Sequence, residues 1–264
     1  MSTRDMLHYL NIHHEEDIQA RIAKYLILHE QDILQLNIVQ VARKCFTSPA
    51  SVSRAARNFG FSNFEEMKRD IHQSVNISNP RFTLRLGPED LKLLSNDAPT
   101  FYQSFAQQIA DTILDTAQTI NTKKIDELIK QIIQTKQAAF FGYDIMLDAV
   151  KVLQNAFLND GCLTRVGEAH KDQLALANQL KVGDVAVVFS SFGNFFSMLP
   201  DVYHAIVDSP AKTILVTQMA STQFTASFDQ TYHISSKLNA EAGSYAMNFL
   251  LEYMARRAYV LSRK

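Results

Sequence analysis

Prolines and a change in apolar spacing divide this sequence into two parts. Pro80, Pro88 and Pro99, three of the six prolines, lie within one short segment. Proline has no backbone N–H group and disfavours a helix at the preceding residue, so this segment is predicted to be a linker or an irregular arm. The predicted organisation is a helical domain at residues 1–77, a linker at 78–102 and an α/β domain at 103–264.

Length, charge and cysteine content exclude several classes of protein. A chain of 264 residues can bury a sizeable core without disulfide or metal staples. Its 26 basic and 27 acidic side chains give a formal net charge of −1, which argues against a uniformly basic surface but allows a local basic patch. With only Cys45 and Cys162, and no CxxC pair, neither a disulfide framework nor a cysteine zinc site is expected. No membrane helix or signal peptide is recognisable, so we expect a cytoplasmic protein that does not bind membranes.

Apolar residues before the prolines follow a helical period, and several polar residues are placed to cap helices. Asn37 with Gln40, and Ser62 with Glu65, have the spacing of a capping box. Ser48 precedes a proline at the first position of a helix. Helices are therefore predicted at residues 16–29, 38–44, 49–58 and 63–75.

After residue 103, short β-rich runs alternate with amphipathic stretches, which is typical of a parallel sheet covered by helices on both faces. The run VAVVF at residues 185–189 is apolar throughout, as expected for a strand buried on both faces. Strands are predicted at 138–142, 163–166, 185–190, 213–217 and 231–234. Helices are predicted at 103–120, 123–135, 145–158, 171–180, 196–208 and 242–261.

Residues 38–60 have the layout of a helix-turn-helix motif. A short helix is predicted to end near Lys44, and a second helix follows a tight connection and ends before Gly60. The inner face of the second helix is predicted to hold Val52, Ala55, Ala56 and Phe59. Its outer face holds Ser51, Arg54, Arg57 and Asn58, residue types that bond base edges and phosphates in the major groove.

Charge in this region also favours DNA. Between Arg43 and Arg69 there are six basic and two acidic residues, a local excess of four positive charges within a nearly neutral chain. From layout and charge alone, an ordinary helical hairpin with a solvated charged face remains an alternative.

The sequence here resembles the N-terminal domain of the RpiR/MurR family of bacterial transcription regulators. The resemblance is carried by Ile38, Val41 and Ala42, by SPASVSR at residues 48–54 and by FGFSNFEEMK at residues 59–68. It implies a winged-helix-like domain that binds a palindromic operator in double-stranded DNA as a dimer. The base- or phosphate-contacting residues that it implies are Ser48, Ser51, Ser53, Arg54, Arg57 and Asn58. The implied contacts to the DNA backbone are Lys44, Lys68 and Arg69.

Members of this family carry a sugar isomerase (SIS) domain after a linker, and residues 103–264 are similar to one. The resemblance implies a three-layer α/β fold with about five parallel strands flanked by helices. It also implies that a phosphosugar binds at the carboxyl ends of the strands, where hydroxyl groups and helix N-terminal amides hold the phosphate.

Two loops depart from the family pattern. The phosphate loop S-x-S-G-x-T/S is here SSFGNF at residues 190–195, and the earlier loop G-x-G-x-S is GYDIM at residues 142–146. Phenylalanine and methionine donate no hydrogen bond, and the carboxylate of Asp144 would repel an anion. The remaining ligand contacts that the resemblance implies are Tyr143, Ser190, Ser191, Gly193, Asn194, Thr217 and Glu241.

Other polar residues suggest chemistry less strongly. Glu168, His170 and Asp172 form an alternating polar cluster in which Glu168 and His170 are residue types that serve as an isomerase base. A solvated loop at the start of a helix explains the cluster more simply. The His13–His14 pair has no neighbouring ligands in the sequence, so no metal or cofactor is predicted.

The prediction is a transcriptional regulator of sugar metabolism genes, not an enzyme. It is expected to bind DNA, to form a homodimer or homotetramer, and to respond to a sugar phosphate or related metabolite through a degenerate SIS domain. Two alternatives stay open: a phosphosugar isomerase-type enzyme, and a regulator whose SIS domain only oligomerises. An isomerase would not need the SPASVSR motif.

Overall fold

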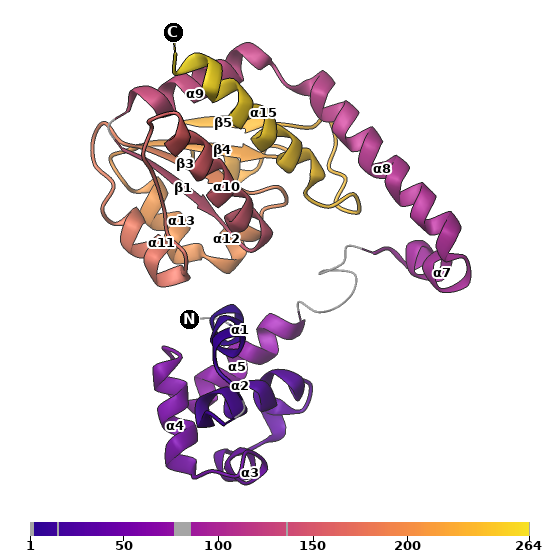
Figure 1. The fold of residues 1–264 in the computed structure, drawn as a ribbon, viewed down its shortest axis with the longest axis vertical. Helices are drawn as coiled ribbons and strands as arrows, with labels where there is room; N and C mark the ends of the chain where they lie inside the picture. The colour runs from indigo at the N-terminus through magenta and orange to yellow at the C-terminus, as the bar shows by residue number, and fades with distance from the viewer. Residues whose placement is uncertain (1–2, 15, 77–85, 136, 264) are drawn as a thin grey trace. The chain divides into compact units, whose positions relative to one another are not determined.

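The computed structural model describes residues 3–14, 16–76, 86–135 and 137–263 (Figure 1). They belong to two compact units, Met1–Leu84 and Arg85–Lys264. The first is entirely helical and the second contains a parallel sheet between helices, so the predicted combination of a helical and an α/β domain is confirmed. No helix within the described ranges is long and apolar enough to cross a membrane.

The N-terminal unit is a small helical bundle around one apolar core. Its core side chains include Ile22, Leu26, Val41, Met67 and Ile71, all fully buried. The helices are α1 (Thr3–Ile12), α2 (Ile18–Leu28), the 3₁₀ turn η1 (Ile33–Gln35), α3 (Ile38–Lys44), α4 (Pro49–Asn58) and α5 (Phe64–Asn76).

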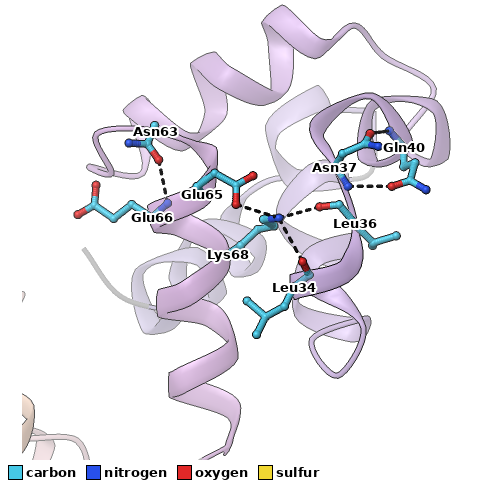
Figure 2. Close-up of polar contacts among 8 residues, drawn as sticks. All are labelled: Leu34, Leu36, Asn37, Gln40, Asn63, Glu65, Glu66 and Lys68. Atoms are coloured by element: carbon cyan, nitrogen blue, oxygen red, sulfur yellow. Dashed lines mark hydrogen bonds and ion pairs between the residues drawn. The ribbon is translucent and has the colours of Figure 1, made fainter.

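Polar caps begin the central helices where the sequence predicts them. Asn37 and Gln40 form a reciprocal capping box at the start of α3, with distances of 2.9 and 2.8 Å (Figure 2). The hydroxyl of Ser48 accepts a hydrogen bond from the Ser51 N–H group at 3.1 Å, and Pro49 begins α4.

The cap of α5 lies one residue later than predicted, so the predicted pair Ser62 and Glu65 is wrong. The side chain of Asn63 accepts a hydrogen bond from the Glu66 N–H group at 2.9 Å (Figure 2). The Glu66 carboxylate in turn accepts one from the Ser62 N–H group at 2.7 Å. Hydrogen bonds from Ser62 lower the pKa of Glu66. Asparagine caps a helix as well as serine does, so two adjacent caps were available and spacing alone did not choose between them.

Much of the predicted linker is helical. Helix α7 (Pro88–Asn96) and helix α8 (Ala98–Thr119) each begin with a proline in the first turn, where the missing N–H group costs nothing. The prolines Pro88 and Pro99 therefore start helices, and an irregular arm is wrong for this part. Pro80 lies outside the described residues.

The C-terminal unit is built on a five-stranded parallel sheet in the order β2-β1-β3-β4-β5. Each strand agrees with the predicted one to within one residue at either end. The strands are β1 (Ala138–Gly142), β2 (Thr164–Val166), β3 (Val185–Phe189), β4 (Lys212–Thr217) and β5 (Gln230–His233). Every residue of β1 and β3 is buried, as the unbroken apolar run predicts.

Helices cover both faces of the sheet, which gives the predicted three layers (Figure 1). One face packs against α9 (Thr122–Gln134), α10 (Ile145–Asn159) and α15 (Tyr245–Leu261). The other packs against α11 (His170–Ala177), α12 (Asn194–Met198) and α13 (Pro200–Val207), and α14 (Gln223–Ala226) lies between β4 and β5 in sequence. The helix predicted at 196–208 is divided, because Pro200 disfavours helix at Leu199.

Candidate nucleic-acid interface and ligand cleft

A tight turn joins α3 to α4 and completes the helix-turn-helix arrangement. Helix α3 ends at Lys44, and the Ser48 cap begins α4 three residues after Cys45. Burial raises the pKa of the Cys45 thiol to about 11, so this side chain stays protonated and serves as part of the core. Cys45 thus packs the turn against the helical core.

One face of α4 is packed and the other is open. The residues predicted to point inward, Val52, Ala55, Ala56 and Phe59, are all buried. On the opposite face Arg54, Arg57 and Asn58 are exposed, and Ser51 and Ser53 are half-buried. The predicted assignment of inner and outer faces is therefore confirmed.

Hydroxyl groups support the arginines on the open face of α4. The Ser48 and Ser51 hydroxyls are 3.0 Å apart, and Arg54 donates to the Ser51 hydroxyl at 3.3 Å. Arg57 donates to the Ser53 hydroxyl at 3.4 Å. Among the residues that the structure describes, no ion pair involves either arginine. Both guanidinium groups therefore keep donors for an external anion such as a DNA phosphate or a guanine edge.

The three lysine and arginine residues predicted to contact the DNA backbone differ in accessibility. Lys44 and Arg69 are exposed. Lys68 is only 5% exposed, and its ammonium group donates to the Leu36 carbonyl at 2.8 Å and lies 3.5 Å from the Leu34 carbonyl (Figure 2). An ion pair with Glu65 at 3.0 Å completes its surroundings.

The assignment of Lys68 to DNA contact is therefore wrong. Its ammonium group holds the loop carbonyls that precede α3, so its role is to join α5 to that loop. A sequence signal for this exists. Lys68 follows the buried Met67 and lies four residues after the buried Phe64, which places it on the inward side of α5.

A small cleft lies where β1 and β3 end. Tyr143, Ser190, Ser191 and Asn194, four of the predicted ligand contacts, line it together. Its volume is about 30 Å³, room for one or two water molecules. The other lining residues are Asp144, Ile145, Met146, Phe189, Phe192, Phe195 and Ser244.

Two apolar side chains, Met146 and Phe195, line the cleft beside the serines. Met146 and Phe195 are buried, and the Ser191 hydroxyl donates to the Met146 sulfur at 3.4 Å. The Ser191 hydroxyl hydrogen is therefore directed to a thioether of the same unit. Ser244, just before α15, also lines the cleft and was not predicted, because no motif marks a residue so distant in sequence.

The remaining predicted contacts lie outside the lining of this cleft. Thr217 is fully buried, donates to the Ser190 carbonyl at 2.7 Å and accepts from the Met219 N–H group at 3.0 Å. Its hydroxyl ties β4 to β3, so a ligand contact is wrong. Glu241 is exposed and lies beside the start of α7. A Cβ atom added to Gly87 would be 3.3 Å from the Glu241 carboxylate oxygen.

Gly193 and Asp144 hold the backbone around the cleft in unusual conformations. Gly193 has a φ of 83°, which strains a residue with a Cβ atom, and an added Cβ atom would lie 2.5 Å from the Met219 sulfur and displace that side chain. Asp144 has φ 55° and ψ −126°, a conformation that glycine favours, at the second glycine position of the family's loop pattern. Asp144 thus holds a backbone conformation of the glycine type although it carries a Cβ atom.

The candidate isomerase bases are not gathered into one site. His170 pairs with Asp201 at 2.8 Å, Glu168 lies 3.8 Å from Lys151, and Asp172 accepts from the Ala169 N–H group at the start of α11. These are the surface and capping roles that the simpler interpretation predicts.

The histidine pair near the N-terminus also has a local explanation. The His13 ring stacks on Tyr9 with 3.8 Å between ring centroids. Within the part of the chain that the structure describes, no three His, Cys, Asp or Glu side chains are grouped to hold a metal ion.

Comparisons with known proteins place these features in context. Residues 6–78 match the helix-turn-helix domain of the rpiR family. An uncharacterized HTH-type transcriptional regulator of Caldanaerobacter subterraneus subsp. tengcongensis is 25% identical over 227 residues, which are 83% of this chain and 75% of that protein. The HTH-type transcriptional regulator HexR of Pseudomonas aeruginosa is 25% identical over 206 residues, 77% of this chain and 69% of HexR. The solved structure of Vibrio vulnificus NanR complexed with ManNAc-6P is similar with a TM-score of 0.49 and 16% identity, covering 99% of this chain and 89% of that one.

The strained loop predicts an unusual gain in stability. Replacing Asp144 with glycine removes the steric cost of its positive φ and is expected to raise the free energy of unfolding of the C-terminal unit by about 1 kcal/mol. The matched variant Asp144→Asn loses the charge but keeps the strain, and is expected to show no such gain. Denaturant unfolding measures both, and equal stability of the glycine and asparagine variants would contradict the assignment of strain.

Proposed function

We propose that this chain, whose N-terminal domain belongs to the rpiR family of helix-turn-helix domains, is a DNA-binding regulator of transcription. The observation that carries the proposal is the open face of α4, where Arg54 and Arg57 face solvent with hydroxyl support and no acidic partner among the described residues. Both relatives named above are HTH-type transcriptional regulators, which supports the same function.

In this proposal α4 enters the major groove of a duplex. Arg54 and Asn58 are the residue types that bond guanine and adenine edges, and we assign base contacts to them. Ser48, Ser51 and Ser53, with Arg57, bond bases or phosphates from the same face. Lys44 and Arg69 are exposed on the neighbouring helices and neutralise phosphates.

The C-terminal domain is proposed to join copies of the chain and to sense a metabolite. A homodimer, or a homotetramer, places two helix-turn-helix domains on the half-sites of a palindromic operator. The cleft at the ends of β1 and β3 is proposed as the effector site, with a sugar phosphate or related metabolite held by Ser190, Asn194 and Tyr143 after Met146 moves. An effector then needs a differential affinity of only about 1–3 kcal/mol between two arrangements of the dimer.

The second candidate is a regulator whose C-terminal domain only oligomerises. The small volume of the cleft favours this candidate. About 30 Å³ is far too little for a phosphosugar, and the Ser191 donor is already used. An isomerase is disfavoured, because Glu168, His170 and Asp172 take part in surface and capping contacts outside the cleft lining. We therefore propose that the chain is not an enzyme.

The base-reading role is tested with Arg54→Ala. The variant is expected to lose about 1–3 kcal/mol of affinity for the preferred duplex, and little of its affinity for random DNA, because a base contact contributes only at the right sequence. Competition binding with both duplexes measures the ratio. An unchanged ratio would refute base reading by Arg54.

The correction of Lys68 is tested by comparing it with Lys44. Removing a phosphate contact lowers the slope of log affinity against log salt by about 1, so Lys44→Met is expected to show that loss. Lys68→Met is expected to keep the wild-type slope and to lose about 2 kcal/mol of folding free energy, because the Leu34 and Leu36 carbonyls lose their donor. Salt titrations below the melting temperature measure the slopes. A reduced slope for Lys68→Met would restore it as a DNA contact.

Effector binding is tested by thermal unfolding with a panel of sugar phosphates and the matching unphosphorylated sugars. A ligand that binds only the folded state raises the melting temperature as its concentration exceeds its Kd. One or more of the phosphates is expected to do so, and more strongly in Asp144→Gly, which lacks the repelling carboxylate. No shift by any panel member in either protein would favour the domain that only oligomerises.

A further inference from the structure

Phe46, in the turn before α4, occupies a backbone position that usually belongs to glycine. Its φ is 49°, and among the described residues only Asp144 shares a positive φ without being glycine. The Phe46 N–H group donates to the Arg43 carbonyl at 3.2 Å, and the Thr47 N–H group donates to the Ala42 carbonyl at 2.9 Å. This pair of bonds is a Schellman motif, and Phe46 is its left-handed residue.

The end of α4 provides an internal comparison. There Gly60 donates to the Arg57 carbonyl at 2.9 Å, Phe61 donates to the Ala56 carbonyl at 3.0 Å, and Gly60 has a φ of 82°. The same motif therefore closes two successive helices, once with glycine and once with phenylalanine. Left-handed backbone is unfavourable for a residue with a Cβ atom, so folding alone favours glycine at residue 46.

Packing of the Phe46 ring inside the protein does not offset the free-energy cost of its left-handed backbone. It is 87% exposed, the largest exposed fraction among the large apolar side chains that the structure describes. No ring contact between described residues involves it. A strained backbone that presents an apolar ring to solvent points to a role in binding rather than in folding.

The position of Phe46 indicates what it meets. It precedes the Ser48 cap by two residues, and the exposed Arg43 and Lys44 lie two and three residues before it, at the end of α3. In a helix-turn-helix domain the first turn of the second helix approaches base edges. Among the base-edge groups of the major groove, the C5 methyl of thymine is the apolar one, and a phenylalanine ring is among the groups that pack on it.

We propose that Phe46 is a further sequence-reading residue, whose ring packs against a thymine methyl group beside the start of α4. The inference rests on the proposed DNA-binding function. It adds an apolar contact from the turn to the polar contacts made by α4. The left-handed backbone already holds the Phe46 ring exposed before DNA binds.

The test starts from a duplex that the full chain selects from a random-sequence library. Each thymine of that duplex is replaced in turn by deoxyuridine, which lacks only the methyl group. At one position per half-site, wild-type affinity is expected to fall about fourfold to tenfold. Phe46→Ala is expected to bind the thymine duplex with a similar loss and to be insensitive to the replacement at that position.

Two further variants separate binding from folding. Phe46→Gly also removes the ring but relieves the left-handed strain, so it is expected to lose the same affinity while melting at an equal or higher temperature. Leu28→Ala removes another exposed apolar side chain of the same unit, 68% exposed at the end of α2, and is expected to bind as wild type does.

The outcomes are distinct. Phe46 variants that bind the selected duplex as wild type does, or that keep its sensitivity to deoxyuridine, would overturn the inference and leave the proposed function intact. A library from which the full chain selects no preferred sequence would overturn the proposed function, and this inference with it.

Discussion

The packing of one face of α4 against the helical core is the constraint on which the DNA-facing surface depends. Ala55 and Ala56 have no side chain beyond Cβ, so α4 lies close to the core, and Val52 fills the remaining space with no exposed area. The Ser48 cap fixes where the helix begins and Gly60 fixes where it ends. With position and rotation set from the inside, Arg54, Arg57 and Asn58 are directed outward, and the two arginines contact the Ser51 and Ser53 hydroxyls of the same helix. Such a surface is ordered before DNA binds, which lowers the entropic cost of recognition.

In each unit a residue other than glycine holds a positive φ beside the candidate site. Phe46 and Asp144 each hold a backbone conformation suited to glycine, one beside the start of α4 and the other beside the cleft at the sheet. In the C-terminal unit the parallel strands still bring Ser190 and Ser191 to the expected edge, because strand register does not depend on loop chemistry. Met146 and Phe195 are buried in the lining of the same cleft and leave it a volume of about 30 Å³.

Most of the architecture was predictable from the sequence, because local signals agreed with one another. The caps at Asn37 and Ser48 and the apolar run of β3 each specify one element, and each is found where expected. Predictions failed where a local signal was ambiguous, at the α5 cap and at Pro88 and Pro99. The failed site assignments depended instead on contacts made at a distance. Lys68 lies in a basic segment and was therefore assigned to DNA contact. Its ammonium group instead donates to backbone carbonyls more than thirty residues away in the chain. Thr217 was misassigned for the same reason, since its hydroxyl is used to join two strands.

The direct test of the central claim is a titration of the full chain against DNA from upstream of its own gene and against a scrambled duplex of the same composition, at two salt concentrations. A regulator that reads sequence through α4 is expected to prefer the upstream duplex at both concentrations. Its affinity for both duplexes is expected to fall as salt rises, because phosphate contacts release counterions. Equal affinity for the two duplexes at both salt concentrations would contradict the claim that the open face of α4 reads DNA.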